Sequence, residues 1–186
     1  MELFIKNMVC DRCKMVVQNE VTALGLTVTQ IELGKVTVLE EHIDPVKEQL
    51  EQKLNTLGFE LLTDKKVKTV EQIKNLIIAS IHHSDDNLKV NLSDYLSEKL
   101  NKDYNTISSL FREVEKNTIE KFFISQKIER VKELLAYDEL NLNEIAFKLN
   151  YSSVAHLSSQ FKKITGISPS VFKKQAEDSR IALDKL

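Results

Sequence analysis

The strongest constraint on this fold is an internal repeat in the second half of the chain. Residues 107–112 (ISSLFR) recur fifty positions later as residues 157–162 (LSSQFK). Each copy follows a shorter segment of helical spacing and a polar turn. The segments are residues 92–100 and 142–149, and the turns are residues 101–103 and 150–152. Apolar residues between the copies, at 119–135, have the spacing of one long helix. We therefore predict two helix-turn-helix motifs joined by a long helix.

The second helix of each motif is expected to have one apolar and one polar face. The apolar faces, predicted to lie against the core, comprise Ile107, Phe111 and Val114 in the first copy and Leu157, Phe161 and Ile164 in the second. The opposite faces carry hydroxyl, amide and basic side chains, which hydrogen-bond base edges and phosphates. The predicted DNA-binding residues are Asn105, Thr106, Ser108, Ser109, Arg112, Ser152, Ser153, His156, Ser159, Gln160 and Lys163.

Capping residues mark the helix ends of the second motif. Asn141 and Glu144 have the spacing of a capping box at the start of its first helix. Ser152 or Ser153 is expected to cap the second helix, and Gly166 to end it.

The charge distribution favours a nucleic-acid partner more than the total charge does. The chain has 26 Lys and Arg against 28 Asp and Glu, a net charge of −2. Residues 145–176, however, contain five lysines and no acidic residue. This local basic patch indicates contact with the phosphates of double-stranded DNA.

Four segments of the second half resemble the AraC/XylS family of bacterial transcription regulators. They are residues 142–146 (LNEIA), 150–153 (NYSS), 161–163 (FKK) and 165–170 (TGISPS), and the resemblance extends over about residues 92–174. It implies a DNA-binding unit with two helix-turn-helix motifs. The implied partners are promoter DNA, the transcription machinery and, in a homodimer, a second copy of the chain.

The first 64 residues change hydrophobic period several times. A short apolar strand is followed by a helix that ends near Gly25, a hairpin that turns at Gly34, a second helix before Gly58, and a last strand. Asp44 and Pro45 are expected to begin the second helix, as N-cap and first-turn residue. The order βαββαβ predicts a four-stranded antiparallel sheet with two helices on one face, the ferredoxin-like arrangement.

Both cysteines of the chain, Cys10 and Cys13, fall between the first strand and the first helix of this unit. Two thiolates at this spacing can converge on one soft ion such as Cu(I). With Met8 and the βαββαβ order, the loop resembles the heavy-metal-associated domain of copper chaperones and metal-pumping ATPases, which implies binding of Cu(I) or another thiophilic ion. A dithiol redox switch and a metal-free dimerisation or docking domain are the alternatives. His82 and His83, beside Asp85 and Asp86, are weighed as a second, divalent site against a solvated linker.

Together these patterns predict an α+β chain of two domains. The ferredoxin-like domain is expected at residues 1–64, a linker helix and boundary at 65–88, the DNA-binding domain at 89–176 and a tail at 177–186. The predicted function is sequence-specific transcription regulation controlled by a thiophilic metal at Cys10 and Cys13. The alternative is a metal-trafficking or protein-docking module. We expect no enzymatic activity, because catalytic constellations and a glycine-rich phosphate loop are missing, and we expect a cytoplasmic protein without a membrane partner.

Overall fold

The structure of the chain is a computed structural model that describes residues 1–83, 91–137 and 139–178. It divides into two compact units. The first unit comprises residues 1–79 and 96–116, and the second comprises residues 80–95 and 117–186. Each unit is described by itself.

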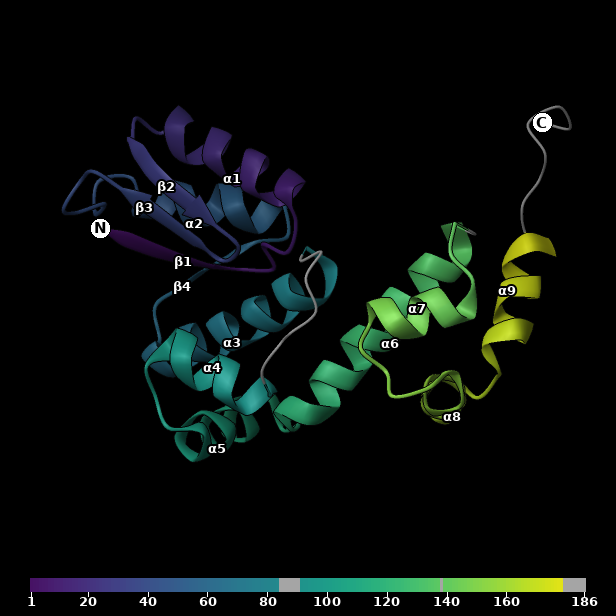
Figure 1. Cartoon of the computed structure of the whole chain (residues 1–186). Helices are drawn as coiled ribbons and strands as arrows, with labels where there is room; N and C mark the ends of the chain where they lie inside the picture. Colours follow the sequence, from purple (N-terminus) through teal and green to yellow (C-terminus); the bar gives the residue numbers. More distant parts are fainter. Residues whose placement is uncertain (84–90, 138, 179–186) are drawn as a thin grey trace, which may run out of the picture. The chain divides into compact units, whose positions relative to one another are not determined.

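A four-stranded antiparallel sheet with two helices begins the first unit (Figure 1). Its elements are β1 (Glu2–Lys6), α1 (Asp11–Ala23), β2 (Val28–Glu32), β3 (Lys35–Val38), α2 (Lys47–Thr56) and β4 (Glu60–Leu62). The strands lie in the order β2-β3-β1-β4, with Leu3 opposite Val36 and Ile5 opposite Leu61. The predicted order of strands and helices is therefore present.

The two faces of the sheet contact different helices. Leu3 and Ile5 are buried in a core that includes Val17 of α1 and Leu50 of α2. Phe4, between them in β1, points to the opposite face because side chains alternate along a strand. There the ammonium of Lys68 lies 5.3 Å from the centre of the Phe4 ring. Lys68 belongs to α3 (Lys65–His82), so α3 lies on the face that α1 and α2 leave open.

Helix α3 is also connected to the first helix-turn-helix motif, which consists of α4 (Leu92–Leu100) and α5 (Tyr104–Glu115). Lys66 forms an ion pair of 2.5 Å with Glu113, and Lys74 forms one of 3.4 Å with Glu115. The sequence predicted a linker in the region of α3. In the structure, residues 65–79 and residues 96–116 both belong to the first compact unit.

The second unit contains the second motif and the helices around it. These are α6 (Ile119–Tyr137), α7 (Leu142–Lys148), α8 (Val154–Thr165) and α9 (Pro169–Asp178). The long helix predicted between the copies is α6, whose Ile128 and Val131 are buried. Helix α9 contacts α6 and α8, and its Phe172 ring lies edge-on to Phe161 at 5.6 Å.

Three asparagines occupy left-handed backbone conformations at the turns that matter most. Asn7, before the cysteine loop, has φ 68°, and Asn101 and Asn150, in the turns of the two motifs, have φ 49° and 52°. Asparagine is among the few residues other than glycine that adopt this conformation readily. A chain with only four glycines thereby forms more tight turns than its glycine content indicates.

Most predicted helix ends are confirmed, and two details are wrong. Asn141 and Glu144 form the capping box, Ser153 caps α8, and Gly166 ends α8 with φ 83°. Asp44, however, does not cap α2, and Pro45 does not lie in its first turn, because a turn closed by the Val46 amide and the Ile43 carbonyl precedes the helix.

The second wrong detail concerns the apolar face of α8. Ile164, predicted to face the core, is 49% exposed. The Phe172 ring from α9 packs on Phe161, and Ile164 lies near the end of α8, outside that contact.

We predict that Gly34→Ala destabilises the protein more than Gly58→Ala does. Both glycines have positive φ, 75° and 82°, so each alanine is strained by about 1–2 kcal/mol. Only at Gly34 would the new Cβ meet a neighbour, Nδ2 of Asn75 at 1.8 Å. This overpacking adds about 1–3 kcal/mol to the loss in free energy of unfolding.

Urea unfolding of both variants measures the difference. Adding Asn75→Ala to Gly34→Ala should recover most of the extra loss, because it removes the side chain that the new Cβ meets. Equal losses at Gly34 and Gly58 would show that α3 does not lie against this turn.

Candidate nucleic-acid interface and thiol pair

The two repeated helices, α5 and α8, present the same surface at positions fifty residues apart. Buried residues coincide, with Ile107 and Phe111 in α5 matched by Leu157 and Phe161 in α8. Exposed residues coincide as well, and the matched pairs include Thr106 and His156, Ser109 and Ser159, and Arg112 and Lys162. Each helix also ends in a left-handed residue, Lys116 or Gly166. The pattern of buried and exposed positions is therefore repeated in the structure, as the residues are in the sequence.

In the first motif, neighbouring groups fix both ends of α5. The Asp103 carboxylate accepts hydrogen bonds from the backbone amides of Asn105 and Thr106, at 2.9 and 3.4 Å, and so caps the helix. At the other end, Glu113 and Glu115 are paired with the lysines of α3. This pairing offsets two negative charges that would otherwise repel DNA phosphates from α5.

In the second motif, several predicted DNA-binding side chains also hold the local structure. The Ser153 hydroxyl accepts the His156 amide at 3.1 Å, and Ser152 Oγ lies 3.0 Å from His156 Nδ1. The Tyr151 hydroxyl donates to Gln160 Oε1 at 2.8 Å. These contacts orient the start of α8 before any ligand binds.

A half-buried lysine from α6 supports the turn of the second motif. The Lys127 ammonium lies 3.8 Å from the centre of the Tyr151 ring. Desolvation by burial lowers the pKa of Lys127 to about 8 and raises the pKa of Tyr151 to about 12. The favourable contact between cation and ring compensates part of the cost of burying the charge.

Most of the predicted DNA-binding residues are exposed in the structure. Ser108 and Gln160 are half-buried, so they present less of their surface than the others. The sequence analysis missed Lys162, which is exposed at the position equivalent to Arg112. The fifty-residue offset of the repeat would have identified it.

The two cysteines meet at the start of α1. Cys10 is the N-cap residue, Cys13 lies in the first turn, and their Sγ atoms are 3.3 Å apart. Both side chains are half-buried. Met8 beneath the loop is fully buried, and the Asn7 side chain ties the loop to the Gly58 carbonyl at 2.9 Å. The loop therefore presents two adjacent sulfurs on a supported backbone.

The surroundings of Cys10 favour its thiolate form. The backbone amide and the thiol of Cys13 lower the pKa of Cys10, partial burial opposes this, and the amide and guanidinium of Arg12 lower it further. A helix N-terminus also favours a negative charge. The lowered pKa makes the Cys10 thiol easier to deprotonate and so a better sulfur donor.

The donor set around the pair is small. Within the described residues, no group of three or more His, Cys, Asp or Glu side chains is arranged to hold a metal. Of the residues weighed as a histidine site, His82 has its Nδ1 3.7 Å from Glu133, and Asp85 and Asp86 lie outside the described residues. Two sulfurs alone suit a soft ion of low coordination number better than tetrahedral Zn²⁺.

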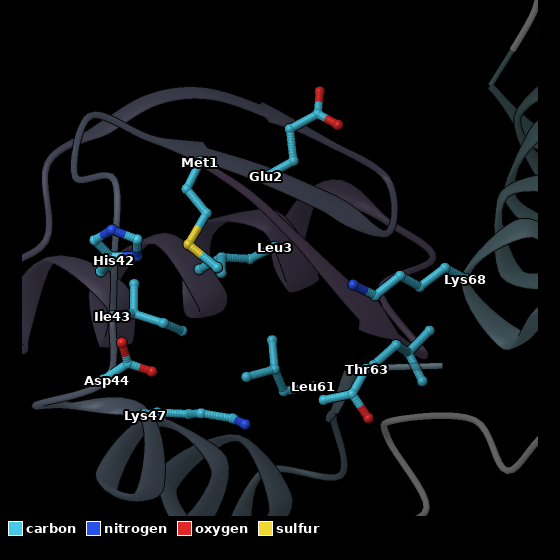
Figure 2. A pocket seen from close by; sticks show the side chains of 11 residues that line it. Met1, Glu2, Leu3, His42, Ile43, Asp44, Lys47, Leu61, Thr63 and Lys68 are labelled. Carbon is cyan, nitrogen blue, oxygen red and sulfur yellow. The ribbon is translucent and has the colours of Figure 1, made fainter. Parts of the chain in front are cut away.

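A separate hollow of about 190 Å³ opens at the other end of β1 (Figure 2). Its rim carries His42, Asp44 and Lys47 on one side and Thr63 and Lys68 on the other (Figure 2). Met1 and Leu3 line it near the start of β1, so it is distinct from the cysteine loop.

Comparison with known proteins identifies the helical part. Residues 96–175 match the family described as "Helix-turn-helix domain". In the helices that the structure describes, none is long and apolar enough to cross a membrane.

Two curated regulators are similar to the chain. The uncharacterized HTH-type transcriptional regulator YtdP of Bacillus subtilis is 28% identical over 158 residues, which is 82% of this chain. The Msm operon regulatory protein of Streptococcus mutans is 26% identical over 110 residues, which is 59% of this chain. The chain spans 20% and 37% of the lengths of these relatives.

Solved structures show the same fold. The C-terminal domain of AraT, a response regulator from Geobacillus stearothermophilus, covers 64% of this chain and is itself covered to 93%, with a TM-score of 0.52 and 22% identity. A Chromobacterium violaceum transcriptional regulator, described as having an AraC-type DNA-binding domain, covers 60% of this chain and is itself covered to 95%. Its TM-score is 0.52 and its sequence identity is 18%. Residues 96–175 thus form a helix-turn-helix domain with the fold of these solved structures, and the two curated relatives are named as regulators.

We predict that alkylation of Cys10 by iodoacetamide has its midpoint at a lower pH than an ordinary thiol, whose pKa is ~8.5. The thiolate is the reactive form, so a lowered pKa moves the rise in rate to lower pH. Cys13→Ala should move the midpoint upward, because the thiol partner is lost, but the backbone amide of residue 13 still favours the thiolate. Mass spectrometry of the reduced, metal-free protein across pH gives the midpoints. A midpoint at or above that of a free thiol would contradict the geometry.

Proposed function

We propose that the chain is a sequence-specific DNA-binding regulator of transcription. The observation that carries this proposal is that α5 and α8 expose polar side chains at equivalent positions, such as Ser109 and Ser159. Both helices lie inside the segment that matches a helix-turn-helix domain. In such motifs the second helix enters the major groove, and its side chains contact base edges. The five lysines of residues 145–176 supply attraction to phosphates.

Within this proposal, the two motifs contact DNA with different chemistry. Arg112 offers a guanidinium that can bind guanine in a bidentate manner. The equivalent Lys162, together with Lys163, provides point charges suited to phosphates. The first motif is thus the better reader of sequence, and the second the stronger electrostatic anchor. A homodimer and the transcription machinery are further proposed partners.

We predict distinct effects of Arg112→Ala and Lys162→Ala on DNA binding. The target site is first selected from genomic fragments, and binding is then followed by fluorescence anisotropy at several salt concentrations. Arg112→Ala should cost about 1–3 kcal/mol at the selected site and relax base preference. Lys162→Ala should weaken all sequences alike and reduce the salt slope by about one.

Lys47→Ala is the matched control, since Lys47 is a lysine of α2 in the sheet region. It should leave both affinity and salt slope unchanged. Failure of the wild-type chain to select any fragment at low salt would refute DNA recognition and favour the protein-docking alternative.

We also propose that a thiophilic metal, with Cu(I) favoured, controls this DNA binding from Cys10 and Cys13. In support, residues 1–62 have the βαββαβ order of the ferredoxin-like, heavy-metal-associated domain, the two sulfurs are adjacent, and the pKa of Cys10 is lowered. The thiol pair would hold the ion as two sulfur ligands. Control requires that the ion bind one DNA-binding state of the chain better than another.

We predict that Cys10→Ser with Cys13→Ser abolishes tight Cu(I) binding, because hydroxyls are poor ligands for soft ions. Competition with a chromophoric Cu(I) chelator measures the loss. The wild-type affinity for the selected DNA should change when one equivalent of Cu(I) is added, and the double variant should not respond.

The double variant should bind DNA as the metal-free wild type does, which separates loss of the ion from loss of fold. An identical wild-type affinity with and without Cu(I) would exclude metal control and leave DNA recognition standing. A response to oxidant in place of Cu(I) would assign the pair to redox sensing.

A further inference from the structure

A buried carboxylate on α3 holds the beginning of the cysteine loop. The side chain of Glu71 is only 6% exposed, and its Oε1 accepts the backbone amide of Asn7 at 3.2 Å. Asn7 is the left-handed residue between β1 and the loop that carries Cys10. A buried charge is costly unless it is paired or hydrogen-bonded, so the Asn7 amide stabilises the buried Glu71 carboxylate.

The second partner of Glu71 is a lysine that it shares with α5. Lys74 Nζ lies 3.2 Å from Glu71 Oε2 and 3.4 Å from Glu115 Oε1. The Lys74 side chain is 18% exposed, so these pairs are poorly screened by solvent. The Lys74 ammonium therefore interacts with two carboxylates: Glu71 of α3, which contacts the cysteine loop, and Glu115 of α5, the helix proposed to bind DNA.

Glu115 needs this ammonium because of its place in α5. It is the last residue of the helix, where the backbone dipole disfavours a negative charge. A cation at that point stabilises the last turn. If Lys74 moves toward Glu71, the end of α5 loses that support.

We propose that Glu71 and Lys74 are positioning residues that transmit the state of the Cys10–Cys13 loop to α5. A change in the loop that withdraws the Asn7 amide leaves the Glu71 carboxylate less compensated. Lys74 is then drawn to Glu71 and away from Glu115. The inference rests on the proposed metal control, and it names the contacts through which that control acts.

The chain offers a closely matched pair of test variants in α5. Glu115→Gln breaks the pair with Lys74, and Glu113→Gln breaks the pair with Lys66, an α3 lysine whose side chain is 59% exposed. Both variants change the charge of the same helix by the same amount. Only the first interrupts the contacts that lead to the loop.

The first readout is the ratio of DNA dissociation constants with and without Cu(I). We expect a wild-type ratio on the order of 5- to 150-fold, the usual range of coupling between two sites. Glu115→Gln should bring the ratio to within about twofold of one, and Glu113→Gln should keep the wild-type ratio whatever its effect on affinity itself. Lys74→Met should behave like Glu115→Gln, and Lys74→Arg should retain the response.

The second readout needs neither metal nor DNA. In amide correlation spectra of the metal-free full chain, Glu115→Gln should shift the Asn7 resonance, and Glu113→Gln should leave it in place. An unmoved Asn7 resonance, or equal losses of the ratio in the two variants, overturns the inference. A wild-type ratio of one would instead refute the metal control, and the Asn7 resonance would still decide whether the contacts transmit.

Discussion

The first unit depends on α3 being buried on two sides. One side meets the sheet through Lys68 above Phe4 and Asn75 against Gly34. The other side meets α5 through Lys66 and Lys74. Because the same helix makes both sets of contacts, the sheet and α5 share one packing element.

This sharing explains why polar residues are buried in α3. Thr69, Glu71 and Asn75 are at most 7% exposed, in a helix that also buries Val70 and Ile73. A helix that served only as a tether would keep such groups in water. Two of the three have partners: Glu71 binds an amide and an ammonium, and the Thr69 hydroxyl donates to the Lys65 carbonyl. Within the described part of the chain, Asn75 Oδ1 is buried without a hydrogen-bond partner.

Much of the architecture was predictable because local rules decide it. The fifty-residue repeat identified both motifs, and the capping box at Asn141 and the glycines at 58 and 166 located helix ends. The place of α3 was not predictable in this way, since hydrophobic spacing shows which face is apolar but not that a second, polar face is also buried.

The candidate sites follow the same division between local and tertiary information. Adjacent thiols at Cys10 and Cys13 follow from spacing and a helix start. The sharing of Lys74 between Glu71 and Glu115 depends on residues 44 positions apart and has no signature in the sequence. The exposure of Lys162 lay within reach of the repeat, whereas that of Ile164 depends on where the Phe172 ring of α9 packs.

The double burial of α3 has a consequence for how such a chain can be recombined. A cut near residue 64, where the first six sheet and helix elements end, looks like a natural joint between modules. Such a cut would nonetheless remove the contacts of α3 with Phe4, Gly34 and the Asn7 amide. The Glu71 carboxylate would then keep only the Lys74 ammonium as a partner. The βαββαβ region can therefore be exchanged in this architecture only together with the face of α3 that it covers.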